Sequence, residues 1–428
     1  MISRPMFDTC FTQNRRLANH LTQLVQSKRA AALPVLSGLA EIVSDATIPL
    51  HIVVTANEIN DLHGTGPLVK RVCKGWQNVC CIRARDDWGV HDFGDWNFCL
   101  SPRPQKRSEF FQSLLRLFRG HKIQTVLCVP FLLDEFLSSI AIHQCFGAEL
   151  CTWLMDDQNI ASRNIPDALM RELLERSSLR LATHPELRFV YEQKYGLPFH
   201  LLPAIVPSQI VSAEVKVPLN GSSNRRRGAL MGSFWDQTWF DRLCNALSRC
   251  DCDIDWFGNN VSPWLKFPLK SLREAGITPH GVIPESRLGD ELKKYPFVLV
   301  PGGVLNEGET NTSVARLSLP GRILFTLATS GTPVLMVGDE RTCGARFIRH
   351  FGIGEVVPYD ASAISAAMDR LSVPENQTSM RQRAAQIAPV FSDHGVSDWL
   401  AASIQLGEPA DRRFEDLFAG YPADIKLK

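Results

Sequence analysis

Short apolar runs alternate with amphipathic segments along most of the chain. The runs PLHIVVTAN at 49–57 and IQTVLCVPF at 123–131 are rich in β-branched residues and predict buried strands. In contrast, EFFQSLLRLFRGHK at 109–122 and DEFLSSIAIHQCFG at 134–147 have apolar residues at the three- and four-residue spacing of helices. Because continuous buried strands that alternate with helices form parallel sheets, this pattern predicts an α/β protein with doubly wound sheets.

The alternation is interrupted at two places, which we interpret as domain boundaries. Residues 1–48 have helical spacing without strands and predict an N-terminal helical extension. Residues 208–227, which include PLNGSSNRRRG, predict a solvated connection, and a second set of strand and helix units starts at GALMGSF. We therefore expect a first Rossmann-like domain at 49–210, a second at 211–390, and a tail at 391–428 that could pack back on the first domain.

Two long polar stretches are predicted as loops. One is DDWGVHDFGDWNF at 86–98, and the other is VLNEGETNTSVARLS at 304–318. The basic triplet Arg225 to Arg227 falls in the predicted connection and is interpreted as a solvated run, because no aromatic residues are interleaved with it.

The composition is that of an ordinary globular protein, and it makes nucleic acid an unexpected partner. The 428 residues are 45% hydrophobic and 21% charged, with a formal net charge of +1. No overall field would attract nucleic acid, so any anion site has to be local. No apolar run reaches the length of a membrane span, and the N-terminus does not resemble a signal peptide, so we expect a cytoplasmic protein.

Cysteine and histidine spacing gives no sign of a metal site. The twelve cysteines are scattered without a CxxC pair, which favours buried free thiols over disulfides or zinc. His91 and His280 are lone histidines in predicted loops, with no paired-ligand spacing around them. We expect no metal and no cofactor.

Candidate chemistry in the first domain lies in the loops that follow strands, since ligands bind at the carboxyl ends of the strands of open parallel sheets. The turn His63-Gly64-Thr65-Gly66 follows the first strand, and Asp156 and Asp157 follow AELCTWLM. Glycines would let the backbone approach an acceptor, and the carboxylates could bind hydroxyl groups or assist proton transfer. The alternative for the glycines is a tight turn. The alternatives for the two aspartates are an N-cap of the following helix and a metal-free structural pair.

In the second domain, Ser318-Leu319-Pro320-Gly321-Arg322 precedes the helix ILFTLATSG. Proline at the first helical position and the free N–H groups of that turn would seat a phosphate, and Arg322 would add a positive charge. The alternative is an ordinary helix start with a solvated arginine. Other strand ends could hold the rest of a nucleotide: Gly232, Ser233, Gly258, Gly281 and Val282 in the turn at 278–284, and Ser313 in the loop at 306–313.

The order of these units resembles that of the GT-B glycosyltransferases, most closely the family 4 type of retaining enzymes. The resemblance covers roughly residues 50–390. It is carried by LATHPELRFVYEQKYGLPFHLLPAIVP at 181–207, MGSFWD, DIDWFGN, ITPHGVIPESRLGDELKKYPFVLVP and LPGRILFTLATSGTPVLMVG. It implies two facing Rossmann-like domains that transfer a sugar from a nucleotide donor to an acceptor.

The chain departs from that family at residues that usually bind the donor. Such enzymes carry two glutamates around the donor helix, whereas Ser318 to Thr326 contains no acid. The family's basic pair after the first strand of the second domain is missing, and Asp156-Asp157 stands where many members have His-Asp. Arg322 matches a basic residue common at the start of the donor helix.

The resemblance implies a metal-independent hexosyl transfer that retains configuration. Asp156 and Asp157 are the candidate catalytic residues because of their placement at the end of a strand. The donor site would include Gly232, Ser233, Gly258, Gly281, Val282, Ser313, Ser318, Gly321 and Arg322, and the acceptor site Gly64, Thr65 and Gly66. The acceptor would be a glycan, lipid-linked or protein group, and peripheral membrane association stays open, as does the oligomeric state. Two alternatives remain: a catalytically silent GT-B module that binds nucleotide, glycan or a protein partner, and a two-domain sugar-binding or epimerase-like protein.

Overall fold

The structure is a computed structural model that describes residues 48–61, 64–87, 89–100, 107–218, 226–234, 236–259, 265–305 and 312–425. Residues 1–47 of the predicted N-terminal extension lie outside this part, as do His63 and most of the loop at 306–313.

The first sheet has seven parallel strands in the order β3-β2-β1-β4-β5-β6-β7. Its strands are β1 (Leu50–Thr55), β2 (Val79–Arg83), β3 (Trp96–Cys99), β4 (Ile123–Cys128), β5 (Glu149–Leu154), β6 (Leu179–Ala182) and β7 (His200–Leu201). The helices of this domain are α2 (Thr65–Val72), α3 (Arg107–Leu117), α4 (Leu133–Phe146), α5 (Asp167–Arg176) and α6 (Pro185–Tyr195). A short 3-10 turn, Ser208–Ile210, follows β7.

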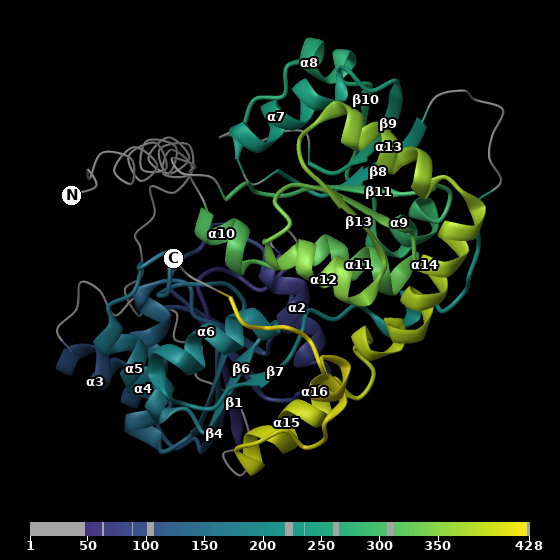
Figure 1. Cartoon of the computed structure of the whole chain (residues 1–428). Helices are drawn as coiled ribbons and strands as arrows, with labels where there is room; N and C mark the ends of the chain where they lie inside the picture. The colour runs from purple at the N-terminus through teal and green to yellow at the C-terminus, as the bar shows by residue number, and fades with distance from the viewer. Residues whose placement is uncertain are drawn as a thin grey trace. The chain divides into compact units, whose positions relative to one another are not determined.

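The second sheet has six parallel strands in the order β10-β9-β8-β11-β12-β13 (Figure 1). The strands are β8 (Arg226–Met231), β9 (Cys252–Phe257), β10 (Ile277–Gly281), β11 (Val298–Pro301), β12 (Val334–Val337) and β13 (Gly354–Val357). The helices are α7 (Gln237–Leu247), α8 (Leu269–Glu274), α9 (Glu285–Leu292), α10 (Thr312–Leu317), α11 (Gly321–Thr329), α12 (Cys343–Phe351) and α13 (Ala361–Leu371).

The local sequence explains these elements well. Central strands such as β4, β5 and β11 are apolar nearly throughout and are buried on both faces, as expected for parallel strands covered by helices. The predicted cap Asp236 is confirmed, because its carboxylate accepts a hydrogen bond from the Trp239 N–H at 2.9 Å and starts α7. The prediction of two Rossmann-like domains is confirmed.

Four C-terminal segments complete the chain. They are α14 (Pro374–Ile387), a 3-10 turn at Ala388–Phe391, α15 (Val396–Leu406) and α16 (Arg413–Leu417). Figure 1 shows α15 and α16 beside the first sheet, where α15 contacts α2 and β5 and α16 contacts β7. Arg188 of α6 forms an ion pair with Glu415, whose other oxygen accepts the Leu201 N–H at 3.0 Å. The chain therefore returns to the first sheet after completing the second.

Three sequence-based expectations were wrong. The stretch at 86–98 is not loop throughout, because Trp96–Cys99 forms the edge strand β3. A short helix, α10, lies within the predicted loop at 304–318. Arg226 and Arg227 do not lie in the connection: both belong to β8, where they form ion pairs with Asp369 and Asp255, although Arg227 is exposed. Arg225 lies outside the described residues.

The expectation of free, mostly buried thiols instead of disulfides is confirmed for the part of the chain that the structure covers. The eleven cysteines found there are all free, and most are buried. Burial raises the pKa of thiols such as Cys128 and Cys151, so they are unreactive core residues. Among the residues described, no helix combines the length and the apolar character that crossing a bilayer requires.

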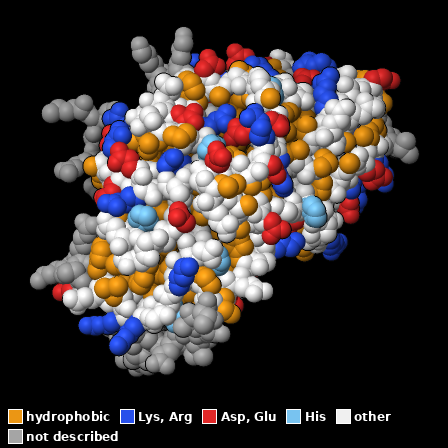
Figure 2. Space-filling view, turned by 90° about the horizontal axis from the view of Figure 1, so that it is seen from below, with side chains coloured by type: hydrophobic (Ala, Val, Ile, Leu, Met, Phe, Trp, Pro, Cys, Tyr) orange, Lys and Arg blue, Asp and Glu red, His pale blue; other side chains and the backbone are white. Residues whose placement is uncertain are grey.

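On the face shown in Figure 2, most charged side chains lie in the upper half, where Lys and Arg are interspersed with Asp and Glu. Ion pairs neutralise several exposed charges of the chain, for example Arg370 with Glu355 and Arg349 with Glu340. With basic and acidic groups mixed in this way, an anion would have to be bound at a specific site.

Candidate functional site

Each sheet has one switch point, which is the pair of neighbouring strands on either side of which the chain adds further strands in opposite directions along the sheet. In the orders above, these points lie between β1 and β4 in the first sheet and between β8 and β11 in the second. Ligands of open α/β sheets bind in the crevice outside the carboxyl ends of the strands at this point. The two switch points are therefore where the predicted site residues should be found.

In the second sheet, glycines allow the loops that follow β8, β9 and β11 to come unusually close to their neighbours. A Cβ on Gly258 would lie 2.2 Å from the carbonyl oxygen of Gly232, and one on Gly303 would lie 2.1 Å from the Ala315 Cβ. Backbone hydrogen bonds hold the same loops side by side: Gly232 N–H donates to Phe257, and Gly258 N–H to Gly281. The predicted donor residues Gly232, Gly258 and Gly281 are thus brought together.

A Gly258→Ala substitution should lower the free energy of unfolding by about 3 kcal/mol, because the new methyl group has no room. Gly321→Ala is the matched control, since no atom lies within 4 Å of a Cβ at that position. Urea unfolding of both variants would measure the difference. Equal stability of the two variants would contradict the packing described for this edge.

Arg322 lies at the start of α11 and reaches the β8 loop. Its guanidinium donates hydrogen bonds to the carbonyl oxygens of Met231, at 3.0 Å, and Ser233. Within the described ranges, Arg322 forms no ion pair with a carboxylate, so its charge is not neutralised there. Burial lowers its pKa to about 10, although the nearby Tyr359 opposes the shift, and the side chain stays cationic at neutral pH.

The helix start next to Arg322 has free donors. Pro320 is the N-cap residue instead of the first helical residue, and α11 begins at Gly321, which is exposed. No side chain caps this end, and the Ile323 N–H donates to the Pro320 carbonyl oxygen at 2.9 Å, so the N–H groups of Gly321 and Arg322 are the ones that can bind a ligand. A cation and a helix N-terminus therefore lie together at the carboxyl edge of the second sheet. A cation beside a helix N-terminus is suited to an anion such as a diphosphate.

Two other predicted donor residues have less definite surroundings. Val282 is 75% exposed, next to Gly281, which has the positive φ of +76° that favours glycine. Ser313 lies in α10, but its side chain is outside the described part of the chain. Their roles in donor binding stay predictions.

The two aspartates predicted as catalytic have different environments. The Asp157 carboxylate accepts hydrogen bonds from four backbone N–H groups, those of Asn159, Ile160, Ala161 and Ser162, at 2.7–3.1 Å. The Tyr191 hydroxyl donates a fifth bond at 3.2 Å. With these five hydrogen bonds, Asp157 organises the loop after β5. This is a structural role, which was one of the alternatives for the aspartate pair.

Asp157→Ala should therefore destabilise the chain, by about 3 kcal/mol, because several loop N–H groups lose their charged acceptor. Asp157→Asn keeps one carbonyl oxygen as an acceptor, so it should lower the free energy of unfolding by less than Asp157→Ala. Chemical denaturation of both variants would test this role. The structural role of Asp157 would be wrong if Asp157→Ala unfolded at the same denaturant concentration as the original chain.

Asp156 instead points to the second domain. Its Oδ1 accepts a hydrogen bond from the Ser318 hydroxyl at 3.0 Å, so the two predicted residues meet although 162 positions separate them in the sequence. Burial raises the pKa of Asp156, while the bond from Ser318 opposes the shift and the charge of Asp157 adds to it. A carboxyl group with a raised pKa between two domains suits acid–base chemistry.

The predicted acceptor residues lie at the switch point of the first sheet. Gly64 is the N-cap residue of α2, and Thr65 and Gly66 begin that helix. A Cβ on Gly66 would lie 2.0 Å from the Asn60 carbonyl oxygen, so this glycine is required for packing. A cavity of about 10 Å³ lies beside them, lined by Thr55, Glu58, Phe131 and neighbouring residues. This space holds about one water molecule, so a sugar could enter only if the loops opened.

Sequence reasoning missed His184, which is 1% exposed and follows β6 as the N-cap residue of α6. Its position directly after a strand is the signal that could have identified it. Burial lowers the pKa of His184 to about 4, and an interaction with the Leu317 backbone opposes the shift only in part. The imidazole is therefore neutral.

His280, by contrast, has a structural role. Its Nε2 lies 2.6 Å from the Asp255 carboxylate, and its ring stacks on Phe257 with the centroids 5.1 Å apart.

Comparison with solved structures identifies the architecture. HepE of Anabaena, in complex with UDP and glucose, superposes with a TM-score of 0.59 at 12% identity, over 84% of this chain and 100% of that chain. Sucrose-phosphate synthase from Thermosynechococcus elongatus gives 0.55 at 14% identity, over 87% and 100%. A UDP-N-acetylglucosamine 2-epimerase gives 0.51 at 12% identity, over 89% and 98%.

No protein-family model and no curated protein matches the sequence. The evidence for relationship is therefore structural. Two parallel α/β domains in the same arrangement, matched over nearly the whole length of each neighbour, show that this chain has the GT-B fold.

Proposed function

We propose that this chain is a glycosyltransferase that moves a hexosyl group from a nucleotide-sugar donor to a glycan, lipid-linked or protein acceptor. The observation that carries the proposal is the placement of Arg322. Its guanidinium is fixed by two carbonyl oxygens at the switch point of the second sheet, beside the uncapped start of α11. The named ligand of the neighbour HepE, UDP, carries the kind of group that such a site would bind.

In the proposed reaction, the bond between the sugar C1 and the diphosphate oxygen breaks, and the bond from C1 to an acceptor oxygen forms. Arg322 and the N–H groups at Gly321 would stabilise the negative charge that develops on the diphosphate, without a metal ion at that position. Glycines 232, 258 and 281 would let the nucleotide approach the backbone.

The acceptor hydroxyl loses a proton as it attacks. Asp156 would orient that hydroxyl, and the proton would pass to this carboxylate or to an oxygen of the departing diphosphate. If the acceptor attacks from the face that the nucleotide leaves, configuration at C1 is retained. The contact of Asp156 with Ser318 supports this role, since it places the carboxylate next to the segment that leads into α11.

A catalytically silent GT-B module is the second candidate. The stretch Ser318 to Thr326 contains no acid, and the Thr326 hydroxyl is buried against the Met231 sulfur at 3.6 Å, where it cannot reach a ligand. A sugar-binding or epimerase-like function is a third candidate, because the chain is structurally similar to a UDP-N-acetylglucosamine 2-epimerase. All three candidates bind nucleotide or sugar, but only the first transfers a sugar.

Calorimetric titration with UDP, GDP and ADP, followed by incubation with the corresponding radiolabelled nucleotide sugars and candidate acceptors, separates these functions. Binding of one nucleotide together with labelled acceptor supports transfer. Binding without transfer supports the silent module, and interconversion of the free sugar nucleotide supports an epimerase. No binding of any nucleotide would contradict the proposal.

A further inference from the structure

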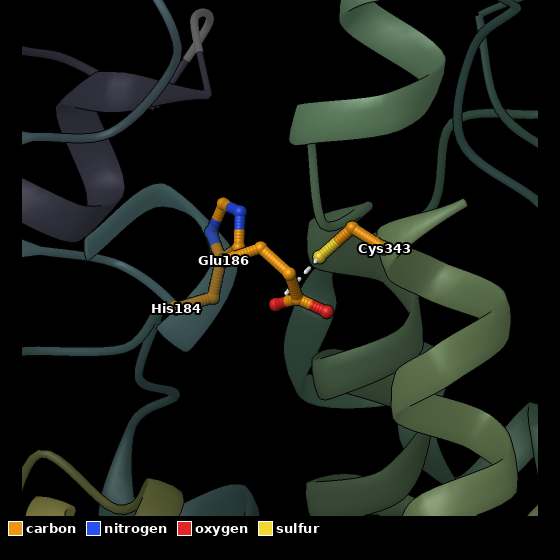
Figure 3. Close-up of side chains that lie close together, drawn as sticks. All are labelled: His184, Glu186 and Cys343. Atoms are coloured by element: carbon orange, nitrogen blue, oxygen red, sulfur yellow. Dashed lines mark hydrogen bonds between the residues drawn. The ribbon is translucent and has the colours of Figure 1, made fainter. Parts of the chain in front are cut away.

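Three buried side chains from two domains meet beside the candidate site. His184 and Glu186 lie at the start of α6, and Cys343 is the first residue of α12 (Figure 3). An imidazole nitrogen, a carboxylate oxygen and the thiol sulfur lie within 4.8 Å of one another. All three side chains are at most 1% exposed. These are nitrogen, oxygen and sulfur donors in a dry environment.

The hydrogen bonds of His184 indicate which ring nitrogen carries the proton. The Thr183 hydroxyl donates to the Met155 carbonyl oxygen at 3.1 Å, so it has no proton left for His184. We therefore assign the ring proton to Nδ1, which lies 3.0 Å from this hydroxyl and donates to it. The neutral ring then has its lone pair on Nε2, a buried atom that forms no hydrogen bond of standard geometry in the described part of the chain, while the Leu317 backbone is the other polar group beside the ring. A buried lone pair without a donor is the feature that a metal ion would satisfy.

The other two residues already have suitable geometry. The Cys343 thiol donates to Glu186 Oε2 at 3.3 Å, and ligand atoms of a tetrahedral zinc site, with bonds of about 2.0–2.3 Å, lie about 3.3–3.7 Å apart. The other carboxylate oxygen, Oε1, accepts from the Tyr421 hydroxyl at 2.7 Å and lies 3.4 Å from Arg346 Nε. Thr183 and Tyr421 thus hold the imidazole and the carboxylate from behind, as outer-shell residues do in zinc sites.

We propose that His184, Glu186 and Cys343 bind one Zn²⁺ ion that joins the two Rossmann-like domains at this point. Binding would replace the thiol proton, so that Cys–SH and Zn²⁺ give Cys–S–Zn and a released proton. The carboxylate and thiolate neutralise the ion, while Arg346 keeps its interaction with Oε1 and with Asp424. The described residues supply three ligands, which leaves the fourth tetrahedral position for water or another small ligand.

This site has a different role from the diphosphate site. His184 and Glu186 belong to the first domain and Cys343 to the second, so an ion bound to all three would restrain any relative movement of the domains. GT-B domains with a shared crevice would need such movement for closure and product release. Zinc would therefore act as a clamp whose occupancy tunes that movement.

Cobalt substitution tests the site without any activity measurement. The metal-free full chain would be titrated with Co²⁺, and we expect sulfur-to-cobalt charge-transfer absorption that saturates at one equivalent and is displaced by Zn²⁺. Cys343→Ser should lose this absorption. Cys244→Ser is the matched control, because Cys244 is also buried but lies in α7, outside the cluster, and this variant should keep it.

Tyr421→Phe removes only the hydrogen bond to Glu186, and it should weaken Zn²⁺ binding by about 10–100-fold. Absence of the charge-transfer band in the original chain would overturn the proposal, as would an unchanged band in a folded Cys343→Ser variant. If Cys343→Ser does not fold, the test uses the original chain, Cys244→Ser and Tyr421→Phe instead. Equal Zn²⁺ affinity in the original chain and in Tyr421→Phe would then refute the proposed zinc site.

Discussion

Arg322→Met should lower the rate of glycosyl transfer by about 10²–10³-fold, the cost of removing one donor from a site that stabilises a developing anion. The substitution removes the charge at the start of α11 together with the two hydrogen bonds to Met231 and Ser233. Nucleotide affinity, measured by calorimetry, should fall as well, since the diphosphate is bound before and after transfer.

Two variants distinguish charge from packing at this position. Arg322→Lys keeps the cation but not the forked donors, so it should retain part of the nucleotide affinity that methionine loses. Arg349→Met is the matched control, because Arg349 is a half-exposed arginine on α12 that pairs with Glu340 at 2.8 Å. Equal nucleotide affinity in Arg322→Met and Arg349→Met would show that the phosphates bind elsewhere.

Asp156→Asn should lower turnover by about 100-fold or more, the usual contribution of a positioned acid–base group. Nucleotide affinity should change little, since an asparagine oxygen can still accept the hydrogen bond from Ser318. Steady-state kinetics at saturating donor, with a calorimetric titration of the same variant, would separate the two effects.

The pH profile gives a second readout of Asp156. Burial raises its pKa, so the carboxylate becomes protonated, and inactive as a base, at a higher pH than an ordinary aspartate. The acidic limb of kcat/KM should therefore lie above the usual aspartate range in the original chain and disappear in Asp156→Asn. Asp157→Asn is the matched comparison and should keep the limb. Full turnover in Asp156→Asn would end its assignment as a catalytic residue.

Much of the fold could be predicted because buried parallel strands leave a plain signal. Runs such as IQTVLC and ELCTWL are apolar nearly throughout, and they became β4 and β5 at the centre of the first sheet. The strand β3 could not be found in this way, because it is an edge strand whose residues are at most partly buried. The helix start at Gly321 and the strand ends at Asp156 and Gly232 were predictable from the same logic, since parallel strands place their following loops at one edge.

Contacts between distant segments were outside the reach of the sequence pattern. Cys343 meets Glu186 across 157 positions, and neither residue lies in a motif with ligand spacing. Asp156 and Asp157 look equivalent as neighbours in the sequence, yet one is saturated by loop N–H groups and the other faces Ser318. These distinctions depend on side-chain direction and on packing between domains, which periodicity does not encode.

The most direct test of the account is a crystal structure of the chain with its bound nucleotide. We predict the diphosphate at the switch point of the second sheet, with its oxygens in hydrogen-bond contact with the Arg322 guanidinium and the N–H groups at Gly321. A nucleotide bound at another edge, or a crevice that leaves Arg322 facing away from the phosphates, would contradict it.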